Sequence, residues 1–178
     1  MEQRKNILVI IGSASAGSSS EKLAHYFAVQ TAAVFAVSLY NELKLLPHFD
    51  PGRSVTDPPE AVMTLRKKIE QAHGVLICTP EYVFSIPSGL KNAIEWCVAV
   101  TVFSEKPVGI ITASASGVKG HEELKMILQT VGASFTEATT LLIQGVKGKI
   151  GPQGQITDAE TEQAFIQFTD AFKALTGG

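Results

Sequence analysis

Cysteine is scarce in this sequence. Only Cys78 and Cys97 occur among its 178 residues; they form no Cys-x-x-Cys pair, and no group of histidine and cysteine has zinc-binding spacing. A disulfide framework is therefore excluded as the basis of the fold, and we predict no metal site. Both cysteines lie in apolar segments, which is typical of buried, reduced thiols in the cytoplasm.

The sequence also lacks a surplus of positive charge and has no long apolar run. Fifteen Lys and Arg residues stand against 17 Asp and Glu residues, so the formal net charge is −2, and no strong positive field would hold a nucleic-acid backbone or an anionic membrane. No apolar run approaches the roughly 18 residues of a membrane span. The charged residues 1–6 precede an apolar run, residues 7–11, that is shorter than a secretory signal peptide needs. We expect a cytoplasmic protein with neither a nucleic acid nor a membrane as partner.

Apolar residues are plentiful enough for a core. They make up 45% of the chain, which excludes a disordered chain. A chain of this length buries about 70% of the surface that it exposes when unfolded, so it needs neither a disulfide nor a metal for stability. We predict a single domain over residues 1–178.

Short apolar segments alternate with amphipathic ones. Uninterrupted apolar stretches such as residues 7–11 are typical of strands covered on both faces. Apolar residues at helical spacing, such as Leu90, Ala93 and Ile94, indicate helices with a buried face. Strands are predicted at residues 6–11, 31–39, 74–78, 107–113 and 139–143. Helices are predicted at residues 20–33 and around 62–69, 87–98, 124–131 and 165–175, with a loop over residues 145–154.

This alternation predicts a parallel sheet with helices on both faces. Five strands in a chain of this length favour the flavodoxin-like, doubly wound α/β fold with strand order 2-1-3-4-5 over the six-stranded dinucleotide-binding fold. Ligands of such sheets bind at the carboxyl ends of the strands, here between the first and third strands. The loops after strands one, three and four are therefore the informative ones.

The loop after the first strand, residues 12–20, is rich in glycine and serine. Its hydroxyl and amide groups, together with the positive end of the following helix dipole, suit a terminal phosphate. It has neither the Gly-Lys-Ser/Thr ending of a Walker motif nor a Gly-x-Gly-x-x-Gly, so a permanently bound NAD is disfavoured. A serine-rich helix cap without a ligand is the alternative interpretation.

The loop after the third strand carries Tyr82, Val83 and Phe84 between two prolines, Pro80 and Pro87. A stiff wall with backbone polar groups suits a flat heteroaromatic ring with polar edges. The alternative is that these side chains only cover the end of the sheet.

The loop after the fourth strand, residues 112–120, begins with small residues that permit close approach of a ligand. Ser114 lacks the flanking glycines of a nucleophile elbow, because Thr112 and Ser116 occupy those positions, so a serine hydrolase is disfavoured.

Together these motifs resemble a known family. The Gly-Ser at 12–13, Thr-Pro-Glu-Tyr at 79–82, Ser-Ile-Pro at 85–87 and Leu-Lys-Asn-Ala-Ile-Glu-Trp at 90–96 are similar to those of the NADPH-dependent FMN reductases. That family has a flavodoxin-like fold and includes quinone, chromate and azo-dye reductases. The likeness extends over nearly the whole chain. It implies a non-covalent FMN, with NADPH or NADH as co-substrate and a quinone, flavin or similar small molecule as electron acceptor.

The resemblance also implies which residues bind FMN. The phosphate would lie in the first loop, the ring against the second, and the ring edge near the third. In that order, the implied cofactor-binding residues are Ser13, Ser15, Ser18, Ser19 and Ser20; Pro80, Glu81, Tyr82 and Val83; and Ser114, Ala115, Ser116 and Gly117. No catalytic side chain is predicted, because the flavin carries the chemistry and the protein positions it.

The chain departs from the family pattern at several positions. Family members often carry Arg in place of Ser15 and Asn in place of Ser20, and losing a charge-assisted contact implies a weaker hold on the phosphate. Val83 and Phe84 stand where Asn and Tyr are frequent. His-Glu-Glu at 121–123 stands where the family usually has an Arg.

We therefore predict an FMN-dependent NAD(P)H oxidoreductase with ping-pong kinetics, in which the acceptor takes electrons from the ring face that NAD(P)H has left. Two alternatives stay open: a non-enzymatic flavin-binding or electron-transfer protein, and a relative in which FMN binding is weakened or lost.

The helix after Pro87 is apolar on a second face, formed by Trp96, Val100 and Phe103. A helix that is apolar on two faces is buried on both, which predicts another subunit here, in a homodimer or homotetramer. Coverage by residues 40–58 of the same chain is the alternative.

Overall fold

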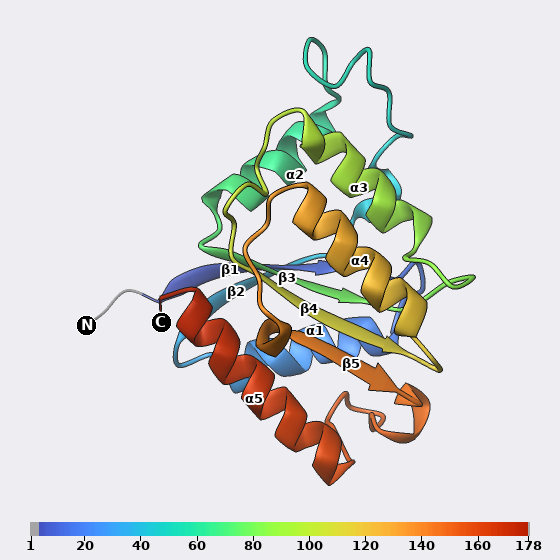
Figure 1. Ribbon diagram of the computed structural model, residues 1–178, viewed down its shortest axis with the longest axis vertical. Coiled ribbons are helices and arrows are strands. Elements are labelled where there is room, and N and C mark those ends of the chain that lie inside the picture. The colour runs from blue at the N-terminus through green and yellow to red at the C-terminus, as the bar shows by residue number, and fades with distance from the viewer. Residues whose placement is uncertain (1–3, 178) are drawn as a thin grey trace.

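A computed structural model describes residues 4–177 as a parallel sheet with helices on both faces (Figure 1). The strands are β1 (Lys5–Ile11), β2 (Phe35–Tyr40), β3 (Gly74–Thr79), β4 (Val108–Ser114) and β5 (Thr140–Gln144). The helices are α1 (Ser19–Gln30), α2 (Glu60–Gln71), α3 (Ser88–Val98), α4 (Val118–Thr130) and α5 (Ala159–Leu175), with 3₁₀ turns η1 (Leu43–Leu45), η2 (Glu137–Thr139) and η3 (Val146–Gly148).

The strand order is β2-β1-β3-β4-β5 and every pairing is parallel. This confirms the predicted flavodoxin-like α/β fold. Every residue of β3 is buried, because helices cover both faces of the central strands, and this is why the strands read as apolar runs without alternation.

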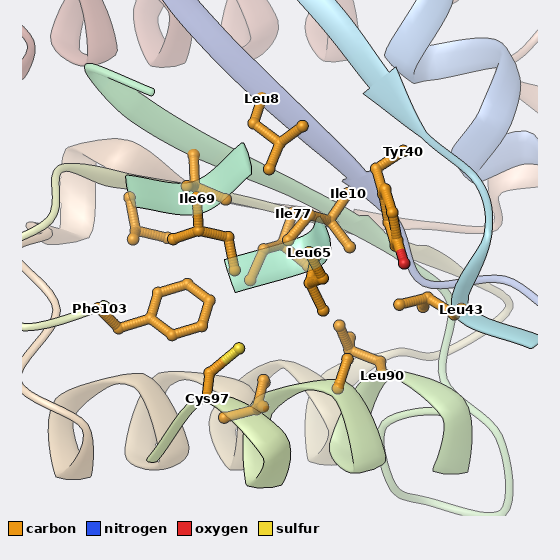
Figure 2. Packing of buried hydrophobic residues seen from close by; sticks show 14 of the residues in the cluster. Leu8, Ile10, Tyr40, Leu43, Leu65, Ile69, Ile77, Leu90, Cys97 and Phe103 are labelled. Carbon is orange, nitrogen blue, oxygen red and sulfur yellow. The ribbon is translucent and has the colours of Figure 1, made fainter. Parts of the chain in front are cut away.

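Two apolar cores lie on opposite faces of the sheet. Helices α2, α3 and α4 lie above it in Figure 1, and α1 and α5 lie below. In the upper core, Ile77 of β3 lies with Leu65 of α2 and Leu90 of α3 (Figure 2). The lower core contains Phe27 of α1 and Phe172 of α5, whose ring centroids are 6.1 Å apart.

The second predicted strand begins later than the sequence suggests. Thr31 ends α1, since its N–H and its hydroxyl both donate to Phe27 O, at 3.0 and 2.7 Å. The N–H groups of Val34 and Phe35 in turn donate to Thr31 O, so residues 31–34 form a turn instead of the start of β2. The predicted loop over residues 145–154 contains η3.

The second face of α3 is covered by the same chain. Trp96 is buried; its Nε1–H donates to Pro47 O (2.8 Å), and its ring meets Phe49 edge to face at 5.3 Å. Phe103 is buried in the upper core. Val100 and Phe103 lie beyond the end of α3, and Val100 stays 38% exposed. Trp96, the part of the predicted face that lies on α3, is thus covered by residues 47–49, and the homodimer or homotetramer stays a prediction.

Both cysteines are free and buried. Burial raises the pKa of Cys97 to about 12 and raises that of Cys78 further, so both thiols stay protonated. No helix within residues 4–177 is long and apolar enough to cross a membrane. The same residues hold no group of three His, Cys, Asp or Glu side chains placed to bind a metal. Residues 1–3 of the charged N-terminal segment lie outside the described residues.

Candidate functional site

The carboxyl ends of the strands meet at one edge of the sheet, to the right in Figure 1. The loops that leave this edge line a cavity of about 330 Å³, a size suited to a small molecule or a cofactor. Its lining residues are Ser13, Ser15, Ser18, Ser19, Ser20, Pro80, Glu81, Tyr82, Ala113, Ser114, Ala115, Gly145, Val146 and Lys147.

The three loops singled out in the sequence therefore meet at one cavity. Most of the predicted cofactor-binding residues line it. Three do not: Val83, Ser116 and Gly117. Val83 is 95% exposed at the tip of a turn, Ser116 is exposed, and the Gly117 N–H already donates to Glu81.

Helix α1 begins at the serine-rich loop. Ser18 is its N-cap, and Ser18 Oγ accepts a hydrogen bond from the Glu21 N–H (3.1 Å). The Glu21 carboxylate accepts from the Gly17 N–H (2.6 Å) and from Asn41 Nδ2 (3.2 Å). Because the first N–H groups of a helix lack partners within it and carry the positive end of its dipole, this end of the cavity favours an anion.

Ser20, in the first turn of α1, has an unpaired hydroxyl. The residue is 1% exposed, and its Oγ has no hydrogen-bond partner among the described residues. An unpaired buried hydroxyl costs about 1–3 kcal/mol. Since Ser20 also lines the cavity, a ligand with acceptor oxygens at this end would pair it.

Tyr82 separates this cavity from a second one. Its hydroxyl lies 3.1 Å from Ser13 Oγ, and both residues line both cavities. The second cavity, of about 320 Å³, extends to Asn41, Lys44 and the start of α3 at Ser88. A ligand in the first cavity therefore has a further hollow beside it, across the Ser13–Tyr82 contact.

Residues 82–85 form a two-residue hairpin. The Tyr82 N–H donates to Ser85 O (2.9 Å), and the Ser85 N–H donates to Tyr82 O (3.0 Å). Between them, Val83 (φ 53°) and Phe84 (φ 56°) are left-handed, a conformation that favours Gly or Asn. Both are largely exposed, Phe84 to 75%. Strained backbone with exposed apolar side chains beside a cavity points to a role in binding.

Two carboxylates fix this hairpin to α4. Glu81 accepts from the N–H groups of Gly117 (3.1 Å) and Gly120 (2.8 Å), and so caps the start of α4. Glu123 Oε2 accepts from the Ser85 hydroxyl (2.6 Å) and from the next backbone N–H (2.8 Å). A Cβ at Gly120 would lie 3.2 Å from Ser85 O. The glycine therefore allows the loop and the helix to approach this closely.

His121 of α4 is buried and does not line the cavity. Its Nδ1 lies 2.8 Å from Thr112 Oγ1. Burial lowers the pKa of His121, and Lys125 lowers it further, while Glu122 and Glu137 oppose the shift. In the described part of the chain no histidine is hydrogen-bonded to Ser114, so the geometry gives the serine-hydrolase alternative no support.

Sequence reasoning missed one wall of the cavity. Gly145, Val146 and Lys147 follow β5 and belong to the predicted loop over residues 145–154, to which the sequence assigned no binding role. The predicted parallel sheet already indicates this wall, because the carboxyl end of β5 must lie at the same edge of the sheet as that of β4. The Gly145 N–H donates to Ala115 O (3.1 Å) and so joins the two loops.

The described residues fit FMN. The unpaired Ser20 hydroxyl and the start of α1 offer hydrogen bonds and positive charge to a phosphate. The small residues Ala113 and Ala115 and the ring of Pro80 line the same cavity and leave room for a flat group.

Comparison with known proteins is consistent with this fit. A family model described as NADPH-dependent FMN reductase matches residues 5–147, which include all five strands and every residue that lines the cavity. The chain belongs to the NADPH-dependent FMN reductase family. The predicted family and enzyme class are thereby confirmed, as are FMN as cofactor and NAD(P)H as electron donor.

This FMN reductase is similar to several named enzymes. It is 31% identical over 173 residues to the NADH:(hydroxy)cinnamate reductase subunit CrdA of Vibrio ruber, covering 92% of this chain and 85% of that one. It is 29% identical over 168 residues to a quinone reductase of Escherichia coli K12, covering 90% and 89% of the two chains.

Among solved structures, it is similar to FerB from Paracoccus denitrificans, a flavoenzyme NAD(P)H:(acceptor) oxidoreductase. The TM-score is 0.85 and the identity 29%, over 97% of each chain.

Proposed function

We propose that this FMN reductase oxidises NAD(P)H and reduces a quinone, a flavin or a similar small acceptor, with ping-pong kinetics. Bound FMN supplies the chemistry, since it accepts a hydride and passes electrons on. The observation that carries the proposal is the cavity at the carboxyl edge of the sheet, where the start of α1, the unpaired Ser20 hydroxyl and Pro80 line one space.

Two groups of residues would hold the cofactor. Ser13, Ser15, Ser18, Ser19 and Ser20 would bind the phosphate through hydroxyl and amide groups. Pro80, Glu81, Tyr82, Ser114 and Ala115 would enclose the ring. The Glu81 carboxylate acts indirectly, because both of its oxygens bond to α4 amides and so hold the two ring-facing loops at a fixed separation.

The small acceptor is supported by the relatives, one named a quinone reductase and one an NAD(P)H:(acceptor) oxidoreductase. We further propose that residues 1–178 act as one domain in the cytoplasm, a compartment that suits the free, buried Cys78 and Cys97. The homodimer or homotetramer is tested by light scattering during size-exclusion chromatography; a monomer at all concentrations contradicts it.

The test begins with the absorbance spectrum of the purified protein before and after addition of FMN. NADPH or NADH is then added without oxygen, followed by a quinone. We expect a bound flavin that bleaches with the nicotinamide and regains its colour with the quinone. Initial rates at several fixed quinone concentrations should give parallel double-reciprocal lines, as ping-pong kinetics require.

Each alternative predicts a different result. A non-enzymatic electron-transfer protein binds FMN but oxidises NAD(P)H only negligibly when quinone is present. A relative that has lost the flavin stays colourless, and its thermal stability does not change with FMN. Either result refutes the proposed function.

A further inference from the structure

The cavity has one positive side chain. Lys147 is the only cation among its lining residues, and Glu81 is the only anion. Both Glu81 oxygens accept hydrogen bonds from the start of α4, at 3.1 and 2.8 Å, so the helix compensates its charge. Lys147 takes part in none of the ion pairs within residues 4–177, and its ammonium is therefore free for a ligand.

The backbone of Lys147 is held in place from both sides. On one side, Val146 is buried in the lower core, and the Gly145 N–H donates to Ala115 O. On the other, the Lys149 N–H donates to Val146 O (3.0 Å) and closes η3. The flexible stem of Lys147 thus starts from a fixed turn at the cavity wall.

The anion-binding end of this cavity is short of charge. A terminal phosphate carries nearly two negative charges at neutral pH, whereas the start of a helix supplies the equivalent of about half a positive charge. The hydroxyl groups of Ser15 and Ser20 are neutral, and residues 12–20 contain no Lys or Arg. A cation from another element would therefore strengthen binding of a phosphate here.

We infer that Lys147 supplies this charge and binds the 5′-phosphate of FMN from the loop after β5. The inference rests on the proposed function. A lysine binds phosphate as a point charge on a flexible stem, so Lys147 can reach an anion in this cavity from the loop after β5. Independently of Lys147, the buried Ser20 hydroxyl in the same cavity lacks a hydrogen-bond partner, which a bound phosphate would supply.

The experiment compares Lys147→Gln with Lys44→Gln, since Lys44 lines only the second cavity. FMN and riboflavin, which lacks the phosphate, are titrated into each apoprotein, and the dissociation constant is read from quenching of flavin fluorescence. For Lys147→Gln we expect about a ten-fold rise for FMN, as lost charge-assisted contacts are strong, and no change for riboflavin. The salt dependence of FMN binding should also become weaker. Lys44→Gln should bind both flavins like the wild type.

Several results would overturn the inference. An unchanged FMN constant in Lys147→Gln excludes the contact, and an equal loss for both flavins places Lys147 at the ring instead. A larger loss in Lys44→Gln places the phosphate in the second cavity. If the wild type binds no FMN, the proposed function fails as well, whereas the other results leave it standing. Because Lys147 is exposed, its variant should melt like the wild type.

Discussion

Ser20 Oγ is buried in the first turn of α1 and has no hydrogen-bond partner among the described residues. Ser20→Ala removes this unpaired group, so the free protein should gain about 1 kcal/mol of unfolding free energy or stay unchanged. The same change removes a donor from the proposed phosphate site, so FMN should bind more weakly. Denaturant unfolding of the apoprotein and fluorescence titration with FMN measure the two effects.

Thr169 of α5 offers a matched control. Its Oγ1 is also buried and unpaired, but the residue does not line the cavity. Thr169→Val keeps the shape and removes the hydroxyl, so it should stabilise the apoprotein without changing the affinity for FMN. A Ser20→Ala protein that binds FMN as tightly as the wild type would contradict the role of this hydroxyl.

Single residues of the site were predictable where their type carries the chemistry. The glycine- and serine-rich composition of the first loop suits a phosphate, whereas the individual cofactor-binding residues were implied by the family resemblance, and ten of them line the cavity. Lys147 was not predictable, because a lone exposed lysine in a loop shows no pattern. The left-handed conformations of Val83 and Phe84 were not predictable either. β-Branched and aromatic residues favour strands, whereas this type of turn favours Asn, Asp and Gly.

At the scale of the element, the hairpin at residues 82–85 holds two residues in a strained backbone conformation that lowers the stability of the fold. Each left-handed bulky residue costs of order 1–3 kcal/mol. The double variant Val83→Asn, Phe84→Gly carries the residue pair that this turn prefers. We expect its unfolding free energy to rise by about 2 kcal/mol, measured by denaturant titration.

The same variant should lose function. Since the replaced side chains are apolar and exposed beside the cavity, we expect a higher KM for an apolar quinone and little change for ferricyanide. Ser88→Ala, outside the hairpin, serves as control for altered loop polarity. A KM that rises equally for both acceptors would show that the variant disturbs the cofactor site instead.

Helix periodicity reveals that a face is buried but not what buries it. The second apolar face of α3 correctly predicts the burial of Trp96, yet residues 47–49 cover it instead of another subunit. The Arg66 guanidinium strengthens this cover, since it donates to Trp96 O and to Ser54 O. Such long-range contacts depend on how a segment without regular structure folds back, and local spacing carries no signal for them.

For the whole molecule, strand order was predictable because it follows from physical rules with few solutions. Apolar runs without alternation require cover on both faces, and short crossovers between parallel strands leave few topologies. The result is two cores separated by the sheet. The stability of the whole fold therefore depends on groups buried on either side of the sheet, and one of these groups, His121, is titratable.

His121 lies in the upper layer, close to the positive start of α4, with its Nδ1 beside Thr112 Oγ1. Burial and Lys125 lower its pKa, with Glu122 and Glu137 opposing. The unfolded chain therefore binds more protons than the folded one between the lowered pKa and the ordinary value of 6.5. The stability due to neutral His121 is complete above 6.5 and is lost as the pH falls through this window.

His121→Gln removes the titration and retains a side chain that can bond to Thr112. Between about pH 8 and pH 5, where carboxylates contribute little, its unfolding free energy should fall less steeply than that of the wild type. His25→Gln changes an exposed histidine and serves as the control for the loss of a histidine elsewhere, on α1. Denaturant unfolding across this range measures all three proteins. Equal slopes for His121→Gln and the wild type would mean that the imidazole accepts a proton inside the folded molecule at no cost to the fold.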